Sequence, residues 1–293
     1  MLLSTTIGTL MKTCEYTDVI NMAKNAGFDA LDFSFNVDRK YVSTEFTDDW
    51  HKKTFTEFRK IAEDKGLVFN QAHAPYPSSV SEEKRTEEIF NEIVISIKNA
   101  SYLGAKCIVV HPCQHLKYDE EEVPEKLFEM NMEFYNRLKP YAEEYDVKIA
   151  IENMWQNIGK KITHSTCSKP EEFIKYIDTL NSKHFVACLD IGHAELVTED
   201  LYNFIKMLGK DRLKALHVHD VDGINDSHTI PYYGIVRWDK VTKALKEIQY
   251  DGDFTYETSY VFTSSRPVAL YQSTLNHLAE TGKHLINQIK SWP

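Results

Sequence analysis

Several common sequence signals are absent from this chain of 293 residues. It contains no P-loop and no Gly-x-Ser-x-Gly motif, the usual marks of phosphate-cradling loops and serine nucleophiles. It also has no run of about 18 apolar residues, so no membrane span is expected. The N-terminal residues lack the basic segment and long apolar stretch of a signal peptide, and we expect a first strand there.

Cysteine is scarce as well. The five cysteines are scattered and odd in number, which does not indicate a disulfide framework, and a reducing cytoplasm is the expected location. The net charge of −10 argues against a nucleic-acid partner, whose phosphates favour a basic face. No heptad or apolar stripe stands out, so the pattern leaves open whether the chain forms a homo-oligomer.

Strand and helix patterns alternate along the chain without a linker or a low-complexity segment. The expected strands cover residues 2–7, 30–35, 67–72, 107–110, 147–151, 185–189, 213–218 and 254–257. The expected helices cover residues 17–25, 48–65, 81–103, 121–145, 170–180, 199–208, 239–248 and 267–289. Eight such units predict an α/β fold, the (β/α)8 TIM barrel, as a single domain over residues 1–293. An open doubly wound sheet is the alternative, but no Gly-rich loop follows an early strand.

Four of the short apolar runs end in a side chain of the kind that binds metal ions. These side chains are Glu152, Asp190, His217 and Glu257, separated by 38, 27 and 40 residues. Each gap fits one strand–helix unit, so successive strands would present these side chains at the same end of the barrel. A carboxylate there is costly unless it is paired or metal-bound, and for either glutamate alone a salt bridge is the alternative. Carboxylates and imidazole suit Mn, Co, Fe, Zn or Mg without choosing among them.

Further polar residues lie at or near the predicted strand ends. His219 follows His217 by two residues and faces the same side of the strand, so one would bind metal and the other substrate; we favour His217 as the ligand. Others end a strand or lie in the loop after it: His73, His111, His193, Asp226 and His228. The longest loops cover residues 34–47, 74–80, 153–169 and 220–237, and two carry lid-like side chains: Trp155, Tyr232, Tyr233 and Arg237.

The motifs around these residues carry a family likeness. They are Ile151-Glu152-Asn153, Leu189-Asp-Ile-Gly-His193, His217-Val-His-Asp220, Tyr256-Glu257-Thr258 and Asp226-Ser-His-Thr-Ile-Pro231 with Gly234 and Trp238. Over nearly its whole length the chain resembles the xylose-isomerase-like barrel superfamily. That superfamily includes sugar isomerases and epimerases, inosose dehydratases and endonuclease-IV type apurinic-site endonucleases.

The resemblance implies specific roles. In the epimerase members, residues matching Glu152, Asp190, His217 and Glu257 bind one divalent metal ion, and the two matching glutamates form the acid/base pair. In the endonuclease members three metal ions are bound, and the extra ligands match His73, His111, His193, Asp226 and His228. This sequence has all nine, which implies one to three metal ions per chain. The endonuclease signature Asp-Thr-Cys-His, however, reads Asp190-Ile-Gly-His193 here.

These observations lead to an expected function. We expect a metal-dependent isomerase or epimerase of a sugar or related ketone, in which Glu152 and Glu257 remove and return a proton through a metal-stabilised enediolate. We expect His193 and His219 to bind substrate oxygens, Trp155 and Tyr232 to pack against the sugar, and Arg237 or Arg266 to meet an anionic group. The alternatives are a multinuclear hydrolase of phosphodiesters, a related dehydratase or lyase, and a non-catalytic sugar-binding barrel.

Overall fold

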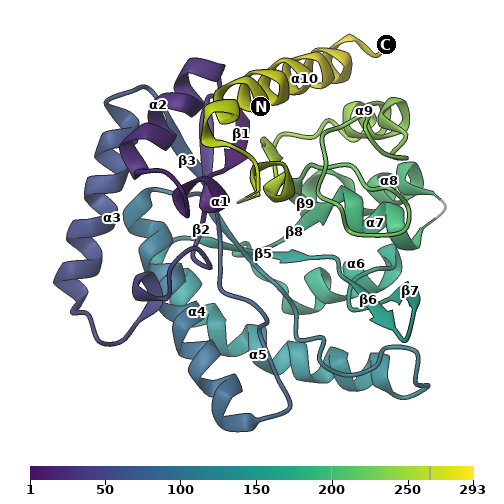
Figure 1. Ribbon diagram of the computed structural model, residues 1–293. Helices are drawn as coiled ribbons and strands as arrows, with labels where there is room; N and C mark the ends of the chain where they lie inside the picture. Colours follow the sequence, from purple (N-terminus) through teal and green to yellow (C-terminus); the bar gives the residue numbers. More distant parts are fainter. Residues whose placement is uncertain (199, 264) are drawn as a thin grey trace.

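Eight short parallel strands form the centre of the molecule (Figure 1). The computed structural model describes residues 1–198, 200–263 and 265–293. The strands are β1 (Leu3–Thr6), β2 (Ala30–Ser34), β3 (Val68–His73), β4 (Cys107–Val110), β5 (Lys148–Glu152), β8 (Phe185–Asp190), β9 (Leu213–His217) and β10 (Phe254–Tyr256). Each begins and ends within two residues of its predicted range. The strands are rich in apolar residues and almost entirely buried, as expected of parallel strands covered by helices.

The sheet closes on itself. Neighbouring strands run in the order β10-β1-β2-β3-β4-β5-β8-β9. The two end strands then meet, because Val218 N–H donates to the Thr255 carbonyl (2.9 Å) and Glu257 N–H donates to the Val218 carbonyl (3.1 Å). The predicted (β/α)8 barrel is therefore confirmed. Since the strands are parallel and in sequential order, all their carboxyl ends open at one face of the barrel.

Helices surround the strands and complete the alternation (Figure 1). They are α2 (Tyr16–Ala26), α3 (Asp48–Glu63), α4 (Glu83–Leu103), α5 (Val123–Tyr145), α6 (Pro170–Leu180), α8 (Leu201–Arg212), α9 (Trp238–Glu247) and α10 (Tyr271–Ser291). The first residue of the helix predicted at 199–208, Glu199, lies outside the described residues. The last helix, α10, packs between α2 and α9 and so completes the ring. Within the described ranges, no helix combines the length and apolar character needed to cross a membrane.

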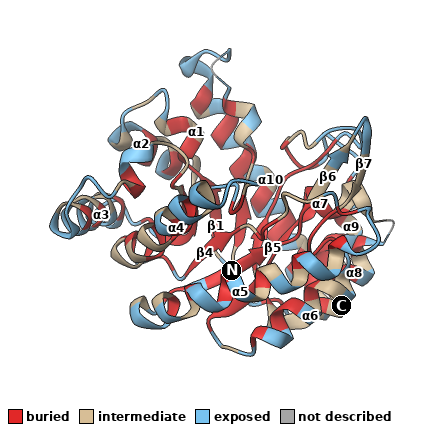
Figure 2. Cartoon of the chain, turned by 90° about the horizontal axis from the view of Figure 1, so that it is seen from below, coloured by how far each residue is buried: buried red, intermediate tan, exposed pale blue. Residues whose placement is uncertain are grey.

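Buried residues lie along the strands and on the helices around them (Figure 2), in two main clusters and a third, small one around the start of α5. The larger lies between the strands and the inner faces of the helices. The smaller fills one side of the barrel interior with small apolar side chains, including Val109, Ala150 and Ala215. The other side of the interior is polar: Ser4 Oγ donates to Asn70 Oδ1 (2.7 Å), and Asn70 Nδ2 donates to Thr255 Oγ1 (3.0 Å). These hydrogen bonds satisfy polar groups that would otherwise be costly to bury.

Several short elements were not predicted. Where the sequence suggests one long loop at 153–169, β6 (Trp155–Ile158) and β7 (Lys161–His164) form an antiparallel hairpin. Its two-residue turn uses Gly159 at φ +68°, a backbone conformation that favours glycine. The other short elements are α1 (Gly8–Met11), α7 (Ile191–Val197), η1 (Arg39–Val42), η2 (Ser259–Phe262) and η3 (Val268–Leu270). Each of these follows a strand or precedes a helix. Such short segments have too few residues for the spacing of apolar side chains to indicate a helix or a strand.

Substitution of Gly282 tests how closely α10 packs on the barrel. A Cβ at this position would lie 2.4 Å from Leu3 Cδ1 and 3.0 Å from Tyr256 Cε2. Gly282→Ala should lower the free energy of unfolding by about 1–3 kcal/mol through overpacking, although alanine is the better helix former. Urea denaturation measures this change. Glu280→Ala, at an exposed position of the same helix, should change it by less than about 0.5 kcal/mol. Stabilisation by Gly282→Ala would show that the contact does not constrain α10.

Candidate metal centre

The four lead residues of the sequence motifs converge at the carboxyl end of the barrel. Glu152, Asp190 and His217 are the last residues of β5, β8 and β9, and Glu257 directly follows β10. His217 Nδ1 lies 3.3 Å from Glu152 Oε1, 3.2 Å from Glu257 Oε2 and 3.8 Å from Asp190 Oδ2. Three of the side chains are buried, and only Glu257 is partly exposed, at 19%. The strand ends thus bring together three carboxylates and one imidazole, as predicted from their spacing.

The atoms at the centre of this group lack ordinary partners. Both ring nitrogens of His217 and the Oε2 atom of Glu152 are buried without a hydrogen bond of suitable geometry among the described residues. Burial lowers the pKa of His217, but Cys188, Glu257 and Glu152 outweigh it and raise the pKa well above its ordinary value. The carboxylates therefore favour a positive charge at this point, which a divalent cation would also supply. The donor set of one nitrogen and three carboxylates fits such a cation.

A second group lies beside the first and shares Glu152. His111 Nε2 is 3.1 Å from Glu152 Oε2, and His73 Nε2 is 3.0 Å from His111 Nε2 and 3.8 Å from the same carboxylate oxygen. The Nδ1 atom of His73 lies 2.8 Å from the Ala74 carbonyl oxygen, which favours a proton on Nδ1 and leaves Nε2 as an acceptor. His73, Glu152 and His217 could together hold a metal ion. The Oε1 atom of Glu152 therefore faces the first group, and its Oε2 atom faces the second.

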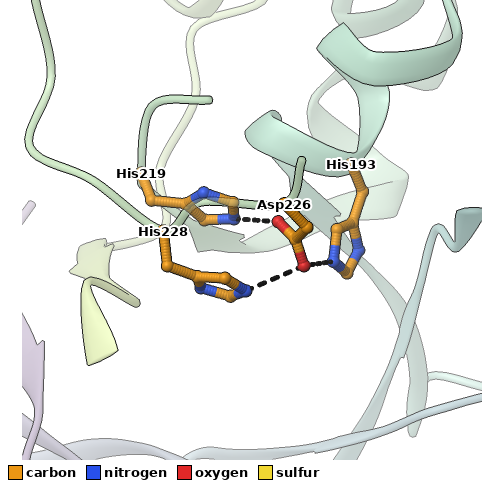
Figure 3. A group of neighbouring side chains, drawn as sticks. All are labelled: His193, His219, Asp226 and His228. Atoms are coloured by element: carbon orange, nitrogen blue, oxygen red, sulfur yellow. Dashed lines mark hydrogen bonds and ion pairs between the residues drawn. The ribbon is translucent and has the colours of Figure 1, made fainter. Parts of the chain in front are cut away.

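A third group contains His193, His219, Asp226 and His228 (Figure 3). Asp226 Oδ2 lies 2.9 Å from His228 Nε2 and 3.2 Å from His193 Nε2. Burial raises the pKa of Asp226, but the adjacent His193 and His228 outweigh it and hold the pKa below its usual value. This group joins the first, because His193 Nδ1 is 3.3 Å from Glu152 Oε1. The fold thus brings all nine predicted ligands into one continuous cluster.

Backbone carbonyl groups orient the histidines of the third group. The Nδ1 atom of His193 lies 3.0 Å from the Asn153 carbonyl oxygen, and that of His228 lies 2.7 Å from the Glu257 carbonyl oxygen. Both contacts favour a proton on Nδ1 and direct Nε2 at Asp226. The Asn153 side chain also pairs with the backbone of Asp190, accepting from its N–H (2.8 Å) and donating to its carbonyl (3.0 Å). Asn153 therefore ties the ends of β5 and β8 together, a function that the Glu-Asn motif alone did not reveal.

His219 is fully buried beside Asp190 and not at an exposed wall of the site. Its Nε2 lies 2.9 Å from Asp190 Oδ2, and its ring stacks on His228 at 4.0 Å between centroids. The ring is also close to Gly192, where a Cβ would lie 2.0 Å from His219 Cε1. The sequence suggests that His219 contacts substrate, and this stays a prediction; the structure places its Nε2 against the Asp190 carboxylate, a contact that can orient that carboxylate.

The long loop between β9 and α9 is organised around the Asp220 carboxylate. It accepts hydrogen bonds of 2.9–3.0 Å from the backbone N–H groups of Val221, Tyr232 and Val236 and from the Trp238 indole. Gly234 passes so close that a Cβ there would lie 2.3 Å from Asp220 Oδ1. Because this loop carries Asp226 and His228, its fixed path positions the third group.

The predicted substrate-wall residues have different surroundings. Trp155 lies next to the cluster, with its ring 6.5 Å from that of His193. Tyr232 is 53% exposed and packs near His284 of α10, and Arg237 pairs with Asp239, so neither is brought to the cluster.

Sequence reasoning missed three residues close to the cluster. The Tyr76 ring stacks on His111 at 4.9 Å between centroids, and the Tyr260 ring lies 5.1 Å from that of His228. Asp32, the third, is the middle residue of β2, with Leu31 before it and Phe33 after it, so the strand-end signal that found Glu152 does not mark it; a lone carboxylate inside an apolar strand is the signal that could have found it. Burial raises the pKa of Asp32 to about 6, although His217 and His73 partly offset the effect.

Comparison with known proteins identifies relatives of two enzyme types. A family model described as a xylose isomerase-like TIM barrel matches residues 20–281. A D-psicose 3-epimerase of Enterocloster bolteae is 24% identical over 81% of this chain and 75% of its own length. A probable endonuclease 4 of Bacillus licheniformis is 29% identical over 69% of this chain and 70% of its own length. The uncharacterized protein MJ1311 of Methanocaldococcus jannaschii is 29% identical, and the match covers 64% of each protein.

Solved structures share the fold. A D-tagatose 3-epimerase-like protein superposes with a TM-score of 0.74 at 21% identity, over 98% of this chain and 99% of its own. The IOLI protein with a binding zinc atom superposes with a TM-score of 0.73 at 19% identity, over 99% of this chain and 98% of its own. At these identities the likeness shows that the barrel architecture is shared.

Substitution of Gly192 tests whether the His219 ring packs against this residue. Helix propensity alone predicts that Gly192→Ala stabilises α7 by up to about 1 kcal/mol, whereas the contact with His219 predicts the opposite sign. We expect a loss of about 1–3 kcal/mol in the free energy of unfolding, measured by urea denaturation. The same substitution in a His219→Ala background should be neutral or stabilising, because the imidazole ring that the new methyl group would displace is absent there. Equal effects in both backgrounds would mean that His219 does not pack on Gly192.

Proposed function

The chain belongs to the xylose isomerase-like TIM barrel family, and from that premise we propose that it is a divalent-metal-dependent isomerase or epimerase of a sugar or sugar-derived ketone. One observation carries the proposal: the carboxylates of Glu152 and Glu257 converge on His217, at 3.3 and 3.2 Å from the same ring nitrogen. The psicose epimerase relative, matched over most of its length, supports it. We further propose that residues 1–293 act as a single catalytic domain.

The residues proposed to hold the cation are Glu152, Asp190, His217 and Glu257. A bound divalent cation supplies Lewis-acid stabilisation of the negative charge that develops when a proton leaves the carbon beside a carbonyl group. We propose that one glutamate removes this proton and that the other returns a proton to the opposite face or to the neighbouring carbon. The Glu257 carboxylate lines an open cavity and can reach a substrate there, while Glu152 acts from the buried side.

Neighbouring side chains have supporting roles in this proposal. His219 orients the Asp190 carboxylate, and Asn153 holds the strand end that carries it. His193 and Trp155 face the substrate from the side of β6 and α7 and limit the access of water. The small-molecule partner is thus a carbohydrate, and the chemistry requires no further cofactor beyond the cation.

The proton-transfer roles predict the behaviour of two conservative variants. Glu152→Gln and Glu257→Gln should each lower turnover of a ketose by about 100- to 10,000-fold, because an amide cannot accept the proton. Product formation and deuterium uptake from D2O at the reacting carbon measure the loss, and circular dichroism checks the fold. Glu280→Gln on the exposed face of α10 is the matched control and should leave turnover unchanged. Full activity of either site variant would rule out this mechanism.

A second candidate function is a hydrolase of phosphodiesters with several metal ions. It is favoured by the two further groups, in which His73 and His111 flank Glu152 and Asp226 bridges His193 and His228. The endonuclease 4 relative supports it as well. A dehydratase or lyase would use the same two glutamates for proton removal, and product analysis would distinguish it.

Metal content separates the two candidates. For protein purified without added metal or chelator, elemental analysis should give about one equivalent per chain if only the group around His217 is occupied. His73→Ala should then leave the content unchanged, as should His284→Ala, an exposed control on α10. Two or three equivalents that fall in His73→Ala but not in His284→Ala would put the hydrolase first. The expected outcome is one equivalent.

A further inference from the structure

The hairpin β6–β7 lies beside the metal-ligand cluster. Its first strand, β6, begins three residues after Glu152. Neighbouring residues of a strand point to opposite faces, so the two faces of β6 have different surroundings. Trp155 lies on the side of the cluster, with its ring 6.5 Å from that of His193. The next residue, Gln156, contacts the loop that follows β4.

Gln156 uses its whole amide group to hold that loop. Its Nε2 atom donates to the carbonyl oxygens of Gln114 (2.6 Å) and Leu116 (2.7 Å), and its Oε1 atom accepts from the Tyr118 N–H (3.1 Å). Both amide hydrogens and the amide oxygen thus have a backbone partner. In the part of the chain that the structure describes, no other side chain of β6 or β7 hydrogen-bonds to this loop. Gln156 is therefore the side chain that joins the hairpin strands to the loop.

The loop after β4 is itself tied to two helices. The Asn131 side chain of α5 accepts from the Cys113 N–H (2.7 Å) and donates to the Cys113 carbonyl oxygen (3.0 Å). The Tyr118 hydroxyl group donates to Glu172 of α6 (2.7 Å). Because these helices pack on the barrel, the three hydrogen bonds of Gln156 connect the hairpin to the scaffold through the loop.

We propose that Gln156 is a positioning residue that holds Trp155 beside His193 as a fixed wall of the substrate site; this role rests on the proposed isomerase or epimerase function. Gln156 makes no hydrogen bond to the cluster among the described residues, because its amide is used by the loop. Its effect on substrate therefore passes through Trp155. A large aromatic ring acts through contact area and the exclusion of water, so a displaced ring weakens substrate binding more than it slows proton transfer.

Two variants test the hydrogen bonds of Gln156. Gln156→Glu is nearly isosteric but places an acceptor oxygen against two carbonyl groups, and Gln156→Met removes the polar atoms at similar size. For the ketose that the wild type turns over fastest among the ketopentoses and ketohexoses, each should raise KM about 10-fold and change kcat by less than about threefold. Asn157→Ala, at an exposed position of the same strand, is the matched control and should change neither. Wild-type kinetics of Gln156→Glu would reject the role of these hydrogen bonds.

A double-mutant cycle distinguishes positioning from a general structural role. Trp155→Ala should raise KM at least as much as Gln156→Met does. In the Trp155→Ala background, Gln156→Met should then change KM by less than about twofold, because the ring that Gln156 positions is absent. Equal effects of Gln156→Met in both backgrounds would show that Gln156 does not act through Trp155 and would overturn the proposal.

Fluorine NMR gives a readout that does not depend on turnover. Protein labelled with 5-fluorotryptophan carries four labelled side chains, and the Trp155 signal is the one missing from Trp155→Phe. Gln156→Met should shift this signal and leave the other signals in place, whereas Asn157→Ala should leave all of them unchanged. If no ketose reacts, the proposed function is in question, but this measurement still decides whether Gln156 positions Trp155. An unchanged Trp155 signal in Gln156→Met rejects that role.

Discussion

The structure depends on keeping several carboxylates close together and away from water at the carboxyl end of the barrel. Burying an ionised carboxylate costs on the order of several kcal/mol unless a compensating charge and hydrogen bonds are present. Histidines meet this requirement in part, since His217 lies within 4 Å of Glu152, Asp190 and Glu257. Both of its ring nitrogens are buried without a hydrogen-bond partner among the described residues, and a bound cation would complete the compensation. Three sets of hydrogen bonds hold this arrangement: Asn153 pairs with the Asp190 backbone, backbone carbonyl groups accept from two histidines, and the Asp220 carboxylate accepts from its own loop.

Much of this could be predicted from the sequence because it follows from the barrel itself. Strand ends that recur once per unit must converge, so Glu152, Asp190, His217 and Glu257 could be placed together without a structure. The side chains on long loops could not, because their direction depends on contacts distant in sequence. Asp220 folds its loop so that Tyr232 and Arg237 lie away from the cluster. The position of the His219 ring likewise depends on its close contact with Gly192. The spacing of apolar residues in the sequence does not predict such a contact.

The barrel mouth divides into two regions with different chemistry. Six strands and their loops supply the acidic and imidazole side chains, while β1 and β2 supply hydroxyl groups, an amide and Lys12. The hairpin β6–β7 bounds the opposite side, where Trp155 lies beside His193. A substrate bound between these regions would contact Glu257, the cluster residue with the greatest exposure to the cavity.

The two candidate functions place opposing demands on Glu152. Its Oε1 faces His217 and its Oε2 faces His111 and His73. If only the group around His217 held a cation, the Glu152 carboxylate would remain available to exchange a proton. If His73, Glu152 and His217 held a further cation, that capacity of Glu152 would be reduced. Under the two proposed functions, the number of bound cations would therefore distinguish proton transfer from metal-assisted hydrolysis, and His73 and His111 are the residues beside Glu152 on which that number would depend.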